Sequence, residues 1–236
     1  MAVRGIETFG VGIADTITAI DLTSSAGSGR VVADSLVVVT DELLAAAKTA
    51  LRARLLASRR AVPDDVRRTE ADAVTEHLEH VAGDAETICA YIPVGTEPGS
   101  AAVLARLSDR GVRVLVPVAL TADDGTPLPL QWGRYRPGSL QTGRFGLLEP
   151  TQPWLPADTL AQADLIVVPA LAVDRRGVRL GRGAGFYDRC LRWRAPHVAL
   201  VAVVRDDELL DEVPAQDHDI AMTHAVTPGR GLVALG

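Results

Sequence analysis

The chain has 236 residues, a mass of 24.9 kDa, 47% hydrophobic residues and a formal net charge of −6. This size and apolar fraction favour one domain with one substantial core. The acidic balance, without a long basic run, argues against a nucleic-acid partner. Because the sequence has no signal-peptide pattern and no apolar stretch of about 18 residues, we expect no membrane association and a cytoplasmic location.

The first 38 residues are rich in Gly, Ser, Thr and Ala and show no sustained hydrophobic period. We expect residues 1–38 to be a disordered extension. This extension is either an added segment or the result of a start codon assigned too early, with the true start near residues 37–39. Residues 39–236 are expected to form a single α/β domain. The only cysteines, Cys89 and Cys190, have no metal-ligand spacing and are expected to be buried thiols in a reducing compartment.

Apolar residues four positions apart predict a helix over 41–58. Lys48 and Arg52, with Arg59 further on, share a face of this helix away from the leucines. Such a face is either solvated or able to bind one anion. A second helix is predicted over 66–81, where His77 and His80 are expected to be exposed because no zinc pattern accompanies them.

Buried-type strands over 86–94 and 112–120, separated by a helix over 101–109, predict a βαβ unit. Glu97 falls in the loop after the first strand, where open α/β sheets bind their ligands. It is either a ligand contact or a first-turn acid that favours the helix dipole.

The segment 121–153 is rich in turn residues and predicts a β-hairpin insertion. Its aromatic residues Trp132, Tyr135 and Phe145 either stack on a ligand ring or pack against one another. Further strands are predicted over 165–171, 197–204 and 221–226, and a helix over 186–193. The pattern predicts an α/β fold with an open, mostly parallel, Rossmann-like sheet flanked by helices.

Between residues 169 and 189, three alternating glycines stand beside arginines and are followed by Asp188. Glycines let backbone N–H groups approach an anion, and arginines add charge-assisted donors. The spacing G-x-G-x-G matches neither a dinucleotide fingerprint nor a P-loop. The residues alone leave two interpretations open, a phosphate site or a plain strand-to-helix connection with Asp188 as a helix cap.

The run Arg179-Leu-Gly-Arg-Gly-Ala-Gly-Phe-Tyr-Asp-Arg189, preceded by Asp174-x-x-Gly177, resembles the signature of the 5-formyltetrahydrofolate cyclo-ligase family. Four other segments resemble family landmarks in the expected order. These are Lys48-x-x-Leu51-Arg52, Tyr91-Ile-Pro-Val-Gly-Thr-Glu97, Phe145-Gly-Leu-Leu-Glu149-Pro150 and His218-Asp219.

The resemblance implies cyclisation of 5-formyltetrahydrofolate to 5,10-methenyltetrahydrofolate with ATP as co-substrate, Mg²⁺ as cofactor, and a monomer that binds only small molecules. It implies a sheet like that of sugar-phosphate isomerases and CoA transferases. Catalytic roles fall on Arg182 and Tyr187, metal binding on Asp188 and Asp219, and folate contacts on Glu97, Phe145 and Tyr187. The implied ATP contacts are Lys48, Arg52, Arg179, Gly181, Arg182, Gly183, Ala184, Gly185, Phe186, Tyr187 and Asp188.

Three positions depart from the family pattern. Ala184 stands where many members have a glycine or a lysine, Phe186 replaces a common tyrosine, and Thr223 stands where an aspartate is frequent. Departures of this kind also suit a non-catalytic or regulatory nucleotide-binding relative. A sugar-phosphate enzyme is suggested by fold analogy alone.

Overall fold

The computed structural model describes residues 29–143, 146–216 and 219–236. Contacts divide the chain into two units, residues 1–42 and 43–236. Helix α1 (Gly29–Ala61) begins in the first unit, well before the predicted residue 41. Residues 1–28 of the predicted extension lie outside the described residues, and the domain boundary at residue 39 stays a prediction.

A seven-stranded sheet with the order β12-β11-β9-β6-β1-β2-β3 forms the centre of the second unit. The five inner strands are parallel, and β3 and β12 add antiparallel edges. The bounds are β1 (Thr87–Ala90), β2 (Arg113–Val118), β3 (Gln131–Arg134), β6 (Leu165–Pro169), β9 (Ala199–Val203), β11 (His224–Thr227) and β12 (Gly231–Ala234).

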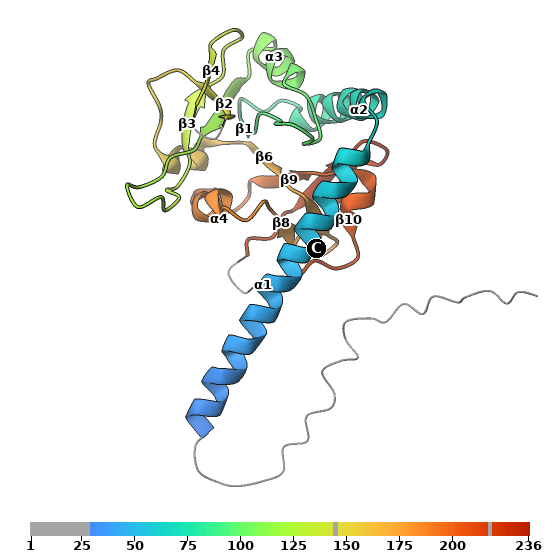
Figure 1. Cartoon of the computed structure of the whole chain (residues 1–236). Coiled ribbons are helices and arrows are strands. Elements are labelled where there is room, and N and C mark those ends of the chain that lie inside the picture. Colours follow the sequence, from blue (N-terminus) through green and yellow to red (C-terminus); the bar gives the residue numbers. More distant parts are fainter. Residues whose placement is uncertain (1–28, 144–145, 217–218) are drawn as a thin grey trace, which may run out of the picture. The chain divides into compact units, whose positions relative to one another are not determined.

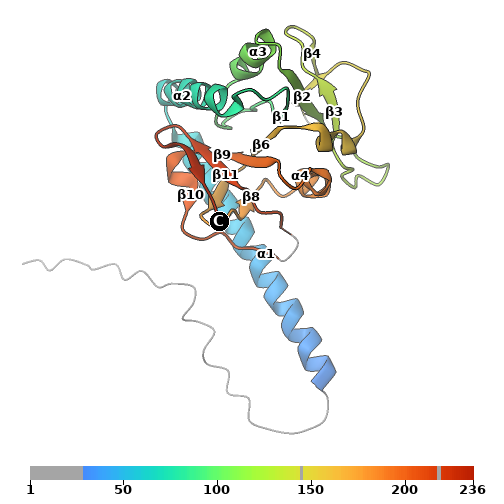
Figure 2. The ribbon, with the colours of Figure 1, turned by 180° about the vertical axis from the view of Figure 1, so that it is seen from behind.

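Both faces of the parallel strands are covered, which explains their nearly continuous apolar sequences. Side chains alternate between the faces, so Ile88 lies in one core cluster and Cys89 in the other. Helices α2 (Asp64–Ala82) and α3 (Ala102–Asp109) cover the first face, as Figures 1 and 2 show. The second face is covered by η3 (Ala157–Gln162), α4 (Phe186–Cys190) and η4 (Leu191–Trp193). The predicted fold class is confirmed.

A three-stranded sheet with the order β10-β7-β8 carries the segment that leads to the glycines. It comprises β7 (Ala172–Asp174), β8 (Arg179–Leu180) and β10 (Leu209–Leu210), and the turn η5 (Asp206–Glu208) precedes β10. Leu55 of α1 packs against Leu171, Leu180 and Val213. This contact joins α1 to the small sheet that positions the glycine-rich segment.

The predicted hairpin insertion is present as β4 (Leu140–Thr142) paired with β5 (Leu148–Pro150), while its first segment joins the main sheet as β3. Trp132 and Tyr135 are buried in the cores, so these two aromatics pack internally. His77 was wrongly expected to be exposed, because its Nε2 lies 3.1 Å from the Pro228 carbonyl oxygen. Among the described residues, no helix is long and apolar enough to cross a membrane.

Candidate active site

The site lies at the carboxyl edge of the parallel sheet, between two adjacent strands from which the chain proceeds in opposite directions. From β1 the chain continues to β2 on one side, and from β6 it continues to β9 on the other. Ligands of open α/β sheets bind at such a switch point. A cavity of about 490 Å³ opens there, lined by Tyr91 after β1, Ala119 after β2 and Ala170 after β6. This volume suits a small-molecule ligand.

The glycine loop, residues 181–185, follows β8 and forms one wall of the cavity. Gly183 and Gly185 have φ values of +100° and +72°, which side chains other than glycine adopt only with strain. Gly185 directly precedes α4. Arg52 of α1 donates from Nε to the Gly181 carbonyl oxygen at 2.9 Å and so holds the loop from outside the cavity lining.

Arg182 reaches from the glycine loop to the loop that follows β1. Its Nε lies 3.1 Å from Oε1 of Glu97. The other carboxylate oxygen of Glu97 accepts a hydrogen bond from the Val94 backbone N–H at 3.0 Å. The Arg182 side chain is 51% exposed and that of Glu97 only 13%. Two residues predicted from separate motifs therefore form one contact at the cavity.

Arg179 is more deeply placed, with a side chain only 7% exposed. Its Nη1 donates to the Pro169 carbonyl oxygen at 3.2 Å, and its Nη2 donates to Asp188. Its guanidinium carbon lies 5.8 Å from the centre of the Tyr187 ring. Arg179 thus links the end of β6, the start of α4 and the ring of Tyr187.

The Tyr187 hydroxyl is buried and has no hydrogen-bond partner among the described residues. Burial is the main cause that raises the pKa of this phenol well above its usual value, so it is a neutral donor at physiological pH. A buried hydroxyl without a partner is costly, and Tyr187 is one of the residues that line the cavity.

The basic face of α1 is not a solvated surface. Lys48 is buried and donates from Nζ to Asp219 Oδ2 at 2.9 Å and to Gln216 Oε1 at 3.2 Å. Neither Lys48 nor Asp219 lines the cavity. The structure therefore brings two predicted ligand contacts together as an ion pair beside the site.

The two predicted metal ligands form ion pairs with different cations, Asp188 with Arg179 and Asp219 with Lys48. Within the described parts of the chain, no group of three or more His, Cys, Asp or Glu side chains could hold a metal ion. Magnesium in nucleotide sites is commonly bound by one or two carboxylates together with phosphate oxygens and water. Asp188, which lines the cavity, fits that kind of site, and both metal assignments stay predictions.

Tyr91 and Arg59 are polar residues of the cavity wall that were not assigned to the site from sequence. Tyr91 follows β1 and donates its hydroxyl to the Pro98 carbonyl. Arg59 is only 1% exposed. Its place on the basic face of α1 was the sequence signal that could have assigned it to the site.

Glu149 is buried and accepts a hydrogen bond from the Ala119 N–H at 3.3 Å, which favours a structural role. Phe145 lies outside the described residues.

Fold and site together define an α/β protein with a glycine- and arginine-rich loop beside a cavity at the switch point of its sheet. Residues 44–228 match the model of the 5-formyltetrahydrofolate cyclo-ligase family. The chain belongs to this family, and the prediction of an enzyme of this kind is confirmed.

Curated relatives carry the same family name. A 5-formyltetrahydrofolate cyclo-ligase of Mycolicibacterium smegmatis is 59% identical over 188 residues, which cover 80% of this chain and 97% of that protein. One from Escherichia coli K12 is 30% identical over 62% of this chain and 80% of that protein. The structure of a 5,10-methenyltetrahydrofolate synthetase of Aquifex aeolicus shares the fold, with a TM-score of 0.65, 24% identity and coverage of 80% of this chain and 92% of that one.

Proposed function

We propose that the protein catalyses ATP- and Mg²⁺-dependent cyclisation of 5-formyltetrahydrofolate to 5,10-methenyltetrahydrofolate, releasing ADP and phosphate. The observation that carries this proposal is the Arg182–Glu97 contact, which brings the glycine loop and the loop after β1 together at one cavity. A two-substrate ligase of this kind requires a phosphate-binding wall beside a carboxylate that can accept hydrogen bonds from pterin nitrogens.

The chemistry has two steps. The γ-phosphoryl group of ATP is transferred to the formyl oxygen, which gives an iminium phosphate and ADP. The N10 amine then attacks the activated carbon, and the C–O bond breaks with release of phosphate. No covalent enzyme intermediate is needed, so catalysis depends on aligning the two substrates and stabilising charge on the transferred group.

The nucleotide phosphates are assigned to the glycine loop residues 181–185 together with Arg179, Phe186, Tyr187 and Asp188. Lys48 and Arg52 are further candidate contacts, and Arg52 donates to the Gly181 carbonyl oxygen of the loop. Arg182 and Arg179 are each paired with a carboxylate. In our proposal a phosphate competes with Glu97 and Asp188 for these arginines, so the cations stay neutralised when no substrate is bound. Asp188 and Asp219 are the candidate carboxylates for Mg²⁺, whose chemistry is to neutralise phosphate charge.

The folate is assigned to the apolar part of the cavity, which includes Ile92, Leu130 and Leu147. Glu97 and Tyr187 supply the polar contacts, and Phe145 remains a candidate for stacking on the pterin ring. We further propose that the enzyme acts as a cytoplasmic monomer. A second candidate is a regulatory nucleotide-binding relative, suggested by Ala184, Phe186 and Thr223.

The test mixes the full chain with 5-formyltetrahydrofolate and Mg-ATP and follows the methenyl product by its ultraviolet absorbance. Controls omit ATP, or omit Mg²⁺ and add a chelator. The proposal requires product only in the complete mixture. Binding of ATP without any product would favour the regulatory relative instead.

A further inference from the structure

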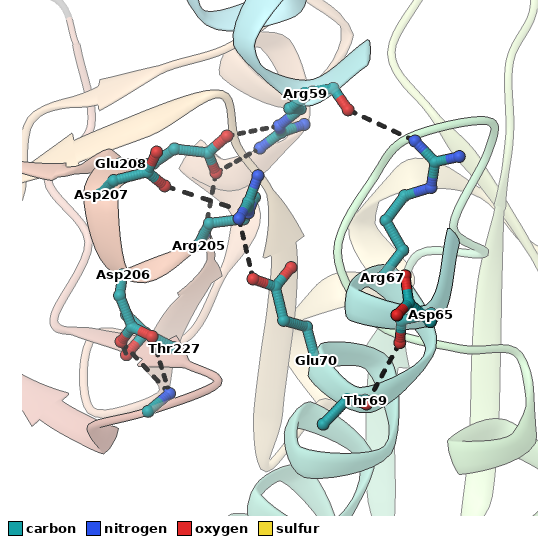
Figure 3. A network of polar contacts seen from close by, with 11 residues as sticks. Arg59, Asp65, Arg67, Thr69, Glu70, Arg205, Asp206, Asp207, Glu208 and Thr227 are labelled. Carbon is teal, nitrogen blue, oxygen red and sulfur yellow. Dashed lines mark hydrogen bonds and ion pairs between the residues drawn. The ribbon is translucent and has the colours of Figure 1, made fainter. Parts of the chain in front are cut away.

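Arg59, near the end of α1, is a buried charge with a defined counterion. Its Nε and Nη2 lie 2.6 Å and 2.8 Å from the two carboxylate oxygens of Glu208, which is itself buried (Figure 3). Nη2 also donates to the Ala170 carbonyl oxygen at 2.6 Å. This side-on, bidentate arrangement uses one edge of the guanidinium plane and fixes the orientation of the other.

The remaining nitrogen, Nη1, has no recorded hydrogen-bond acceptor within residues 29–143, 146–216 and 219–236. Arg59 lines the main cavity and also a smaller one of about 30 Å³. Arg59 and Arg179 donate to the consecutive carbonyls of Ala170 and Pro169, where β6 ends. Two arginines are therefore anchored at the same point of the cavity wall.

The Glu208 carboxylate is also held by the backbone, and a second ion pair lies beside it (Figure 3). Glu208 Oε2 accepts the Arg205 backbone N–H at 2.8 Å, and Arg205 Nη2 donates to Glu70 of α2 at 2.8 Å. Arg205 lines only the smaller cavity. A donor fixed in this way needs no reorganisation to bind a ligand, which makes its contribution to binding larger.

We propose that Arg59 is a further ligand-binding residue that donates from Nη1 to a phosphate oxygen of the nucleotide, beside Arg179 at the end of β6. The inference rests on the proposed function. It adds a third cation of α1, after Lys48 and Arg52, to those of the glycine loop, and this one lines the cavity. Burial strengthens this contact, because water competes little at a side chain that is 1% exposed.

The test compares two variants of the full chain. Arg59→Met alone would leave the buried Glu208 carboxylate unpaired and endanger folding. The double variant Arg59→Met/Glu208→Gln removes both charges while Gln keeps an acceptor for the Arg205 N–H. The matched control is Arg205→Met, which alters the same network but not the main cavity. Thermal unfolding establishes that each variant is folded.

Titration calorimetry with ATP alone measures nucleotide affinity without turnover, and steady-state kinetics give KM for each substrate. We expect the double variant to bind ATP at least about tenfold more weakly, the effect of losing one charge-assisted hydrogen bond. Its KM for 5-formyltetrahydrofolate should be unchanged, and Arg205→Met should stay within about twofold of the wild type. Equal ATP affinity of the double variant and the control would overturn the inference, even if the wild type is an active ligase. Absence of turnover by the wild type would instead count against the proposed function.

Discussion

Arg182 and Glu97 form an ion pair with an Nε–Oε1 distance of 3.1 Å between the glycine loop and the loop after β1. The pair lies at the cavity that both loops line. An approaching phosphate would compete with the Glu97 carboxylate for the same guanidinium. Under the proposed function, nucleotide binding would therefore be linked to the position of Glu97, the acid assigned to the folate.

Replacement of Arg182 by alanine should remove turnover while preserving the fold. The side chain is half exposed and supports little of the core, so the melting temperature should hardly change. Loss of a donor that stabilises the transferred phosphoryl group is expected to lower kcat by about 10²-fold or more. Arg175→Ala is the matched control, since this exposed arginine lies outside the cavity lining. Full activity of Arg182→Ala would contradict the assigned role.

Tyr187→Phe should lower the activity while leaving the stability unchanged or raising it. The hydroxyl is buried without a partner among the described residues, so its removal should leave the free energy of unfolding unchanged or raise it by about 1 kcal/mol. If the hydroxyl donates to a ligand, kcat/KM should fall about tenfold. Chemical denaturation and steady-state kinetics measure both quantities. A less stable, fully active variant would show that the hydroxyl has a partner within the protein.

Much of the fold could be predicted because long elements carry strong periodic signals. The strand predicted over 86–94 is shorter in the sheet, Thr87–Ala90, since the chain leaves the sheet after it and lines the cavity. The strands β7, β8 and β10 were missed, because two or three residues show no period. Their pairing depends on contacts between distant segments.

The site was predicted where a motif is local and missed where it depends on distant pairing. The glycine loop could be recognised from consecutive residues 179–188. The Lys48–Asp219 and Arg59–Glu208 contacts join residues 171 and 149 positions apart, and no local pattern encodes such partners. Spacing on α1 placed Lys48, Arg52 and Arg59 on one face, but the acids and carbonyls facing them became visible only in the fold.

Asp174→Asn should destabilise the turn that leads into β8. The Asp174 carboxylate is fully buried and accepts hydrogen bonds from the backbone N–H groups of Arg176, Val178 and Val213 at 2.9, 2.9 and 3.1 Å. An amide NH₂ facing such donors should lower the free energy of unfolding by about 2–4 kcal/mol. Urea denaturation measures the loss, with the exposed Asp123→Asn as control. Equal stability of the two variants would refute this role.

The buried thiols should make stability depend on alkaline pH. Burial is the main cause that raises the pKa of Cys190 from 9.0 to about 12. Burial also raises the pKa of Cys89. The native state therefore keeps these protons above pH 9 while the unfolded chain loses them. Their contribution to stability is full below pH 9 and falls as the pH rises, by up to about 1.4 kcal/mol per pH unit for each thiol.

The pH dependence is checked by comparing the wild type with the Cys89→Ala/Cys190→Ala variant. Urea denaturation between pH 8 and about pH 10.5 should show a shallower decline for the variant. Comparing slopes removes the effect of the smaller side chains on absolute stability. Parallel declines would mean that the thiols ionise equally in the native and unfolded states.

In the proposed reaction the glycine loop directs a phosphoryl group of ATP to the formyl oxygen. The most direct measurement uses 5-formyltetrahydrofolate carrying ¹⁸O in the formyl group, with mass spectrometry of the phosphate released during turnover. The account predicts one ¹⁸O atom in each phosphate, because the formyl oxygen leaves with the phosphoryl group. Unlabelled phosphate formed together with methenyl product would contradict it.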